Sequence, residues 1–110
     1  MGFKDWRVYQ AAQLLRREVD RILKRVPPGF ENEVRHVDEA VDSILNNIAE
    51  GSAFTYPKKR IYFWQVAKGS ANEAGGGLQS LVDRGALRQG DVWRSIGVTI
   101  STAKMLKKMK

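Results

Sequence analysis

Apolar residues recur at alternating steps of three and four along most of this sequence, and that spacing places them on one face of an α-helix. Clusters of proline and glycine interrupt the pattern at residues 27–29, 51–57 and 85–90. These breaks divide the chain into four predicted helices, at about residues 3–25, 31–50, 57–84 and 91–110. No segment has the strict alternation that is typical of a β-strand.

Four helices with short connections predict an all-α fold, an antiparallel up-down-up-down four-helix bundle. The length of 110 residues suits a single domain that spans residues 1–110. The predicted core faces, from the first helix to the fourth, are Val8, Ala12, Leu15, Val19, Ile22 and Val26; Val34, Val37, Val41, Ile44 and Ile48; Trp64, Ala67, Ala71, Ala74, Leu78 and Leu81; and Trp93, Ile96, Ile100, Ala103 and Leu106.

Proline, glycine and aspartate predict where the helices begin and end. Pro27 ends the first helix, Pro57 suits a first helical position, and Asp91 is the predicted N-cap of the fourth helix. Gly51 follows the second helix, so it should adopt a positive φ as a C-terminal cap. The run of glycines at 75–77 interrupts the third helix, which should either kink there or be approached very closely by a neighbour.

The composition excludes several classes of function. The sequence has no cysteine and one histidine, so it offers no thiolate zinc site and no multi-histidine cage. No apolar run approaches the roughly 20 residues needed to span a bilayer. No nucleophile elbow or phosphate-binding glycine loop is present. We therefore expect a cytoplasmic protein that is not an enzyme, with no catalytic residue, no metal site, no cofactor and no membrane contact.

The chain is basic, and its charge is unevenly distributed along the sequence. It has 19 lysine and arginine residues against 12 aspartate and glutamate residues, a net charge of +7. By segment, residues 1–26 carry +4, residues 27–50 carry −5, residues 51–83 carry +2 and residues 84–110 carry +6. In the acidic segment, Asp38, Glu39 and Asp42 are expected to be solvated. The positive excess indicates either a surface that binds polyanions or a solvated face.

Two basic stripes are the main candidates for nucleic-acid contact. One follows the first helix through Arg17, Arg21 and Lys24, and the other lies at residues 104–108 of the fourth helix. Because these helices are neighbours in an up-down bundle, we expect the stripes to merge into one surface that binds RNA or DNA without reading its sequence. The full candidate set is Arg16, Arg17, Arg21, Lys24, Lys58, Lys59, Arg60, Lys104, Lys107 and Lys108.

The segment 54–64 combines five aromatic residues with three basic ones. Aromatic rings between cations can stack on single-stranded bases while the cations hold phosphates. The alternative is that the aromatic residues belong to the core or to a subunit interface, which we favour for Phe63 and Trp64. Both interpretations stay open for Tyr56 and for residues 58–60.

Three polar residues late in the second helix also stand out. Ser43 and Asn47 adjoin core positions, and Glu50 lies in the last turn, where the helix dipole disfavours a carboxylate. Glu50 is expected either to have a partner, with Arg60, Lys68 or an amide of the third helix as candidates, or to be fully solvated.

These three residues belong to the string Ser43-Ile44-Leu45-Asn46-Asn47-Ile48-Ala49-Glu50-Gly51. The string resembles the Ser-Ile-x-x-Asn-Ile-Ala-Glu-Gly signature of the four-helix-bundle proteins encoded in intervening sequences of bacterial 23S ribosomal RNA genes. Residues 3–12 resemble the opening of that family, and residues 63–73 are similar to its third-helix motif. The motif residues singled out are Ser43, Asn47, Glu50, Gly51, Gly69, Ser70 and Glu73.

The resemblance implies a bundle that assembles as a ring-like homopentamer. It also implies kinship with the accessory variability proteins of diversity-generating retroelements, which bind a reverse transcriptase and nucleic acid. The family tends to carry paired arginines before the Ser-Ile motif, where this sequence has Asp38 and Glu39, and this departure counts against a nucleic-acid surface on the second helix.

Self-association is expected from the residues as well, since the chain has more large apolar side chains than one core seam needs. They are Phe3, Trp6, Tyr9, Leu14, Tyr62 and Phe63. Two hypotheses for function follow. The first is a non-enzymatic oligomeric bundle that binds RNA or DNA through basic surfaces. The second is a protein–protein adaptor, for instance an accessory subunit of a reverse transcriptase, whose basic faces serve solubility.

Overall fold

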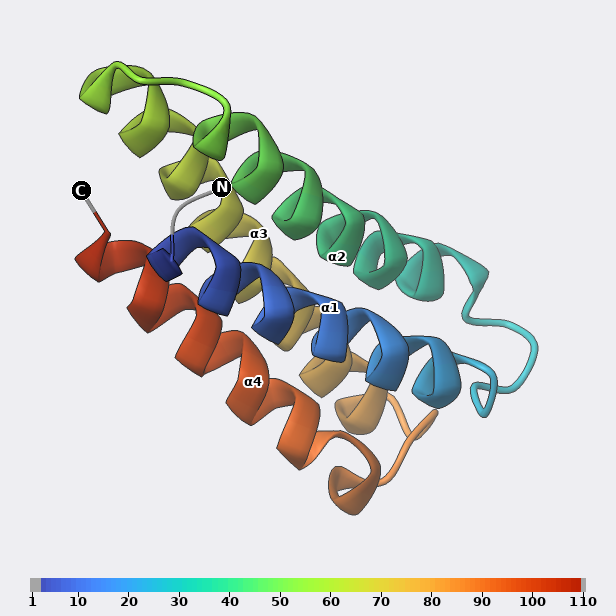
Figure 1. The fold of residues 1–110 in the computed structure, drawn as a ribbon. Coiled ribbons are helices and arrows are strands. Elements are labelled where there is room, and N and C mark those ends of the chain that lie inside the picture. The colour runs from blue at the N-terminus through green and yellow to red at the C-terminus, as the bar shows by residue number, and fades with distance from the viewer. Residues whose placement is uncertain (1–2, 110) are drawn as a thin grey trace.

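The computed structural model describes residues 3–109, with side chains from Asp5 onward. The described residues form the helices α1 (Phe3–Leu23), α2 (Glu31–Ser52), α3 (Pro57–Asp83) and α4 (Gln89–Lys108). α1 packs against α2 and α4, and α3 packs against the same two helices. The helices run side by side, with both chain ends and the α2–α3 connection at one end of the bundle (Figure 1). The predicted up-down-up-down bundle is confirmed.

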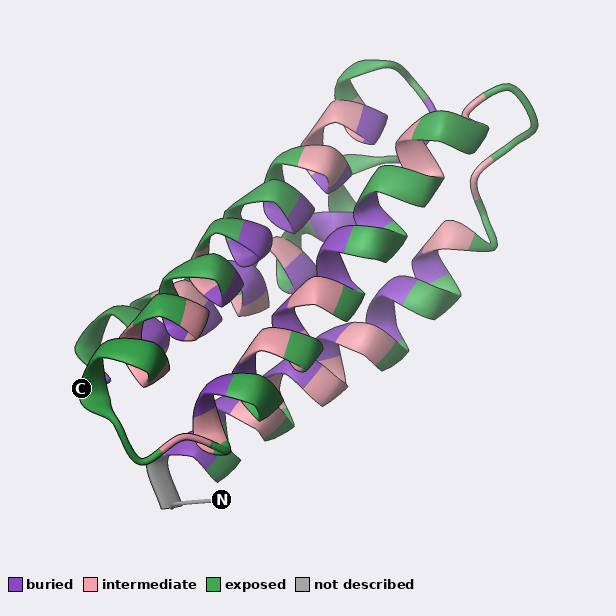
Figure 2. Cartoon of the chain, turned by 90° about the horizontal axis from the view of Figure 1, so that it is seen from above, coloured by how far each residue is buried: buried purple, intermediate pink, exposed green. Residues whose placement is uncertain are grey.

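The predicted core faces of the first three helices are largely confirmed. Buried residues face the interior of the bundle on each helix (Figure 2). Every predicted core residue of α3 is buried, including Trp64, which is 2% exposed. The exceptions are Val26, which lies beyond the end of α1, and Val34, in the first turn of α2; both are half-buried.

The core face of α4 differs from the predicted one. Trp93 is 69% exposed and Ile100 is 50% exposed. The buried residues of α4 are Val92, Ser95, Thr99, Thr102 and Leu106. The hydroxyls of Thr99 and Thr102 donate to carbonyls of their own helix, at 2.6 Å and 2.8 Å, so small polar side chains can face the core without losing hydrogen bonds. Of the predicted residues, Leu106 is buried and Ile96 and Ala103 are half-buried. The prediction followed the largest apolar side chains and therefore chose a face that is rotated from the buried one.

Gly51 does not cap α2, and that prediction was wrong. The helix continues to Ser52, and the positive-φ residues of the described chain are Gly29 and Gly85. Gly51 is buried, and a Cβ at this position would lie 2.8 Å from Nε1 of Trp64 and 3.2 Å from Cβ of Phe63. The residue is a glycine because α3 approaches α2 closely there.

Close approach also accounts for two of the three consecutive glycines in α3, which continues unbroken through them. A Cβ at Gly75 would lie 2.6 Å from Oγ1 of Thr99 in α4, and a Cβ at Gly77 would lie 2.6 Å from Cγ2 of Val37 in α2. The second of the two predicted alternatives therefore holds at these positions. Gly76, between them, faces open space.

The start of α4 corrects another prediction. The N-cap is Arg88 and not Asp91. Asp91 lies in the first turn, where its carboxylate accepts a hydrogen bond from the backbone N–H of Arg88 at 3.0 Å. The positive end of the helix dipole favours a carboxylate in this turn, so Asp91 still stabilises the start of the helix.

Candidate nucleic-acid interface

Antiparallel folding concentrates the uncompensated charge in one half of the bundle. The terminal half comprises the part of each helix nearest the chain ends, residues 5–14, 42–70 and 99–109, and the distal half comprises residues 15–41 and 71–98 (Figure 1). The terminal half has eight lysine and arginine residues against three aspartate and glutamate residues, a net charge of +5. The distal half has nine of each. The net positive charge of residues 5–109 therefore lies in the terminal half.

Five of the predicted nucleic-acid residues are exposed in this half. Two lie at the start of α3 and three at the end of α4: Lys58, Lys59, Lys104, Lys107 and Lys108. None of the five forms an ion pair with a described side chain. The fold thus places the two lysine groups, which are more than 40 residues apart in the sequence, at the same end of the bundle.

Two further basic residues line concave surfaces beside these lysines. Lys68 and Lys107 line a cavity of about 110 Å³ between α3 and α4. Arg7 and Lys108 line a concavity of about 310 Å³ between α1 and α4. Sequence reasoning missed Lys68 and Arg7 because each stands apart from other basic residues along the chain. They could have been found by summing the charge of each half-helix and placing neighbouring helices antiparallel.

The aromatic segment before α3 has a packed part and an exposed part. Phe54 stacks on Phe63 with ring centroids 5.5 Å apart, and the Lys59 ammonium lies 5.0 Å from the centroid of the Phe54 ring. The core position that we favoured for Trp64 is confirmed. Tyr56 and Tyr62 are 71% and 61% exposed, so their rings are accessible for stacking.

Arg60 joins helices together. Its Nη2 donates to Oδ2 of Asp5 in α1 at 3.2 Å, and its guanidinium carbon lies 4.7 Å from the centroid of the Trp64 ring. Asp5 is 3% exposed, so the pair is largely shielded from solvent. These contacts favour a structural role for Arg60 over contact with phosphate.

Arg16, in the distal half, is likewise held by carboxylates. Its guanidinium donates to the carboxylates of Asp20, Asp38 and Asp42 and to the carbonyl of Asp38. Burial acts to lower the pKa of Arg16, but hydrogen bonds and charge interactions with Asp38 and Asp20 raise the pKa above its ordinary value. Asp38 and Asp42 are exposed, as expected, but both also form ion pairs with Arg16, so they are not simply solvated. Glu39 is exposed.

The two predicted basic stripes do not merge. Arg17, Arg21 and Lys24 are exposed, but they lie in the distal half. α4 runs antiparallel to α1, so the end of α1 lies beside the start of α4, where Arg25 pairs with Asp91 at 3.3 Å. The lysines at 104–108 lie at the opposite end of the bundle (Figure 1). The prediction used the adjacency of the two helices and overlooked their direction.

The motif residues of the second helix join α2 to α3. The hydroxyl oxygens of Ser43 and Ser70 are 2.7 Å apart, and Nδ2 of Asn47 donates to the carbonyl and hydroxyl of Ser43 at 2.8 Å and 3.1 Å. One turn further along α2, the absence of a side chain at Gly51 leaves room for Trp64 of α3. Glu50, Gly69 and Glu73 are exposed, and the Glu50 carboxylate pairs with neither Arg60 nor Lys68. Ser43, Gly51 and Ser70 therefore hold the two helices together, and Asn47 supports Ser43 from within α2.

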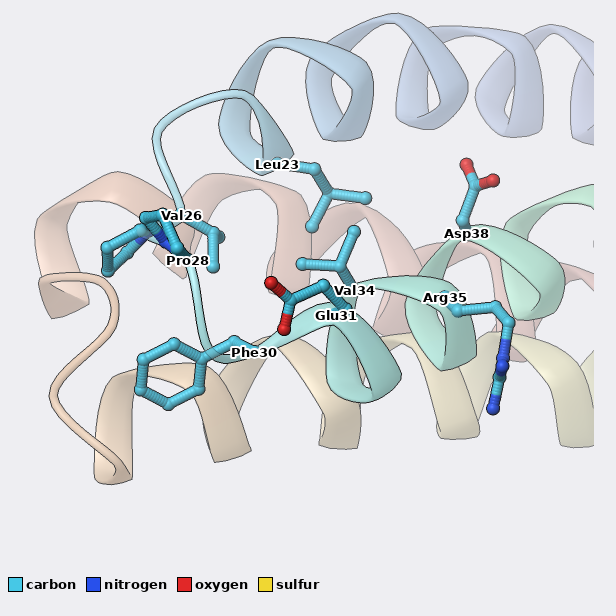
Figure 3. Close-up of a pocket in the computed structure, with 9 residues that line it drawn as sticks. Leu23, Val26, Pro28, Phe30, Glu31, Val34, Arg35 and Asp38 are labelled. Carbon is cyan, nitrogen blue, oxygen red and sulfur yellow. The ribbon is translucent and has the colours of Figure 1, made fainter.

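A concavity of about 490 Å³ lies beside the α1–α2 connection, away from the terminal half. Leu23, Val26, Phe30 and Val34 line it together with the charged residues Glu31, Arg35 and Asp38 (Figure 3). The backbone N–H of Gly29 donates to both carboxylate oxygens of Glu31, at 3.0 Å and 3.1 Å, and lowers the pKa of that carboxyl. None of the candidate nucleic-acid residues lines this concavity.

Within the part of the chain that the structure describes, no three histidine, cysteine, aspartate or glutamate side chains gather as metal ligands. No helix there is long and apolar enough to cross a membrane.

Comparison with known families decides the relationship of this chain. Residues 4–108 match the family described as 23S rRNA-intervening sequence protein, a match that spans all four helices. The chain belongs to this family. A search of curated proteins found no match. In this 23S rRNA-intervening sequence protein, the sequence string at 43–51 lies in the α2–α3 contact, whereas the exposed lysines lie at the end of the bundle.

Proposed function

We propose that this 23S rRNA-intervening sequence protein is a non-enzymatic, self-associating bundle that binds RNA or DNA through its terminal half. The observation that carries the proposal is the net charge of +5 in the terminal half against zero in the distal half. An uncompensated positive surface attracts phosphate backbones, and binding releases condensed counterions. Contacts to the backbone carry no sequence information, so RNA and single-stranded DNA should both bind.

The exposed lysines and tyrosines supply the contacts. Lys58, Lys59, Lys107 and Lys108 provide ammonium groups that no described carboxylate neutralises. Tyr56 is 71% exposed beside Lys58, where its ring can stack on an unpaired base. Arg60 and Arg16 are left out of this surface because their guanidinium groups are held by aspartates.

Self-association repeats the basic surface. Exposed large apolar side chains, among them Trp6, Tyr62 and Trp93, favour burial against further copies of the chain. A closed ring would use the same contacts on every subunit, and five copies is the number that the family resemblance implies. Repetition of weak phosphate contacts around a ring multiplies them into useful avidity.

The test compares two double charge reversals of equal size. Lys107→Glu with Lys108→Glu changes the terminal half, and Arg17→Glu with Arg21→Glu changes the distal half by the same four charge units. We expect the lysine variant to bind single-stranded RNA and DNA about tenfold or more weakly, and each lost phosphate contact to reduce the slope of log affinity against log salt by about 0.7–0.9. The arginine variant should lose less, and both should keep the oligomeric mass.

Filter binding and fluorescence anisotropy across a salt series measure these changes. Equal losses in both variants would show that binding follows total charge and not the terminal half. If the wild-type protein retains neither nucleic acid at low salt, the protein–protein adaptor becomes the favoured function.

A further inference from the structure

A concavity of about 360 Å³ lies where the end of α1 meets the start of α4, in the distal half of the bundle (Figure 1). Side chains of both helices line it. Its volume lies within the range of sites that hold small ligands, about 300–1,000 Å³. The basic surface of the terminal half lies at the other end of the molecule, so this concavity is a separate feature.

An aromatic ring and three guanidinium groups line the concavity. Trp93 of α4 is 69% exposed, although an indole gains much from burial. The guanidinium groups are those of Arg21 in α1, Arg25 just after α1, and Arg94 in α4, and all three side chains are exposed. A flat ring beside several arginines suits a ligand that combines a planar ring with an anion.

Two carboxylates also line the concavity, and the protein itself satisfies both. Glu18 is 7% exposed; its Oε1 lies 3.3 Å from Nε of Arg94, and its Oε2 accepts a hydrogen bond of 3.0 Å from the Ser95 hydroxyl. Asp91 accepts hydrogen bonds from Nη1 of Arg25 at 3.3 Å and from the N-cap backbone N–H of α4 at 3.0 Å. Each carboxylate therefore holds one arginine in position.

These ion pairs leave most of the arginine N–H groups open to a ligand. Arg94 pairs through Nε and Arg25 through Nη1, and the structure gives their other side-chain nitrogens no hydrogen bond to a described residue. Arg21 has no ion pair with a described side chain. A buried ion pair contributes little net stability. The burial of Glu18 is therefore better explained by the position that it gives to Arg94, whose side chain is 75% exposed.

The number of guanidinium groups favours a phosphate over a carboxylate as the anion. A carboxylate has two oxygens and one charge, which a single arginine can satisfy through two parallel hydrogen bonds. A terminal phosphate has three oxygens and nearly two charges, so it can accept from two or three guanidinium groups at once. Three guanidinium groups against two carboxylates leave a charge of +1 in the concavity, which suits an anion.

The geometry points to a site for a single nucleotide with a terminal phosphate. The base stacks on the indole of Trp93, and the phosphate accepts hydrogen bonds from Arg21 and from the open N–H groups of Arg25 and Arg94. A free nucleoside monophosphate and the phosphorylated 5′ end of a strand present the same chemical groups. The site lies in the distal half, so this inference does not rest on nucleic-acid binding by the terminal half.

A second copy of the chain is the competing occupant, because Trp93 is one of the exposed apolar residues that favour self-association. A copy packed on the indole would also cover the neighbouring guanidinium groups, and their desolvation is unfavourable unless the copy supplies anions. Contacts between copies can use Trp6 and Tyr62, which do not line the concavity. The arginines therefore favour an anionic ligand at Trp93.

The first test measures binding of adenosine 5′-monophosphate by isothermal titration calorimetry, with adenosine and inorganic phosphate as separate probes. The nucleotide should bind more tightly than either part, since it uses the ring and the guanidinium groups together. Trp93→Ala and Arg21→Gln should each weaken nucleotide binding about tenfold or more, because the first removes the stacking surface and the second a charged donor. Trp93→Phe should restore most of the affinity, since its ring still stacks.

Arg17→Gln and Tyr62→Ala are the matched controls for Arg21→Gln and Trp93→Ala. Both residues are exposed, and neither lines the concavity. Both controls should keep the wild-type affinity for the nucleotide. Equal losses in Arg17→Gln and Arg21→Gln would overturn the site, and so would a wild-type protein that binds no nucleotide at millimolar concentration.

Oligonucleotides with a 5′-phosphate or a 5′-hydroxyl then identify the source of the nucleotide. A 5′-phosphate that strengthens binding by the wild type but not by Arg21→Gln would show that the site takes strand ends. A 5′-phosphate without effect, in a protein that binds the mononucleotide, would show that it takes free nucleotides. Tighter binding of a peptide of aspartate and phenylalanine than of the nucleotide would overturn the ligand class.

Two further measurements separate this site from the rest of the molecule. Lys107→Glu with Lys108→Glu should keep the wild-type affinity for the mononucleotide, and loss of that affinity would place the nucleotide in the terminal half and overturn the site. Trp93→Ala should keep the wild-type mass in sedimentation velocity. A monomer from this variant, with nucleotide binding unchanged, would assign the indole to contact between copies and overturn its role in the site.

Discussion

The distal half and the terminal half of the bundle differ in how far their basic side chains are paired with carboxylates. In the distal half, Arg16 pairs with Asp20 and Asp38, and also with Asp42 at the edge of the terminal half. Arg25 pairs with Asp91, and the largely buried Glu18 is held by Arg94 at 3.3 Å and Ser95 at 3.0 Å. In the terminal half, Lys58, Lys59, Lys107 and Lys108 extend from the bundle with no described ionic partner.

The difference shows that charge along the chain and charge in space are separate properties. Residues 1–26 and 27–50 look like a basic and an acidic helix, but Arg16 of α1 pairs with Asp38 and Asp42 of α2 and so cancels part of that contrast. The surplus that remains comes from half-helices that lie far apart in the sequence. Ion pairs stabilise the distal half. In the terminal half the exposed lysines repel one another, and a bound polyanion would reduce that repulsion.

The largest expected effect on stability is in the terminal half. Gly51→Val places a branched side chain where a Cβ already lies 2.8 Å from Nε1 of Trp64, so α2 and α3 must separate. Overpacking of this kind costs about 1–3 kcal/mol. Urea unfolding measures the loss, and Gly90→Val is the control, since Gly90 is exposed with no such atom within 4 Å. Equal losses in the two variants would show that helix propensity and not close approach is responsible.

A smaller effect is expected from the ion-pair cluster around Arg16, near the middle of the bundle. Arg16→Met leaves three carboxylates facing one another, but Asp20, Asp38 and Asp42 are each about half exposed and therefore partly screened. We expect a loss of about 1 kcal/mol at low salt and a smaller loss at high salt. Arg17→Met should have little effect, since Arg17 is exposed with no described ionic partner. A loss that does not change with salt would indicate that Arg16 acts through packing.

The smallest effect concerns Glu31, beside the α1–α2 connection. The Gly29 N–H lowers the pKa of this carboxyl below its ordinary value of 4.5, so the ionised form stabilises the fold. That contribution is fully present above the ordinary value and is lost as pH falls through the lowered value. Glu31→Gln should therefore be slightly less stable than the wild type in urea at neutral pH and equally stable well below the lowered pKa. An equal deficit at both values of pH would point to a cause other than ionisation.

The helices and most of the core could be predicted because the spacing of apolar residues along each helix indicates which face is buried. Val8 to Ile22 and Trp64 to Leu81 repeat at helical spacing, and burial of large apolar side chains dominates the choice of face. In α4 the same rule failed, because Ser95, Thr99 and Thr102 satisfy their hydroxyls locally or against Glu18 and so can occupy the core. The bulky Trp93 and Ile100 were left outside.

By itself the sequence determined the number of helices, their approximate ends, the antiparallel order and the family, since all of these are encoded in residues that are close along the chain. The tertiary structure decided what Gly51 does, which basic residues are held by aspartates, and which exposed lysines have no ionic partner among the described residues. Each of these depends on the atoms that another helix brings within a few ångströms. Lys58 and Lys107 share one end of the bundle because α3 and α4 run in opposite directions, and Arg21 lies at the other end because α1 and α4 do.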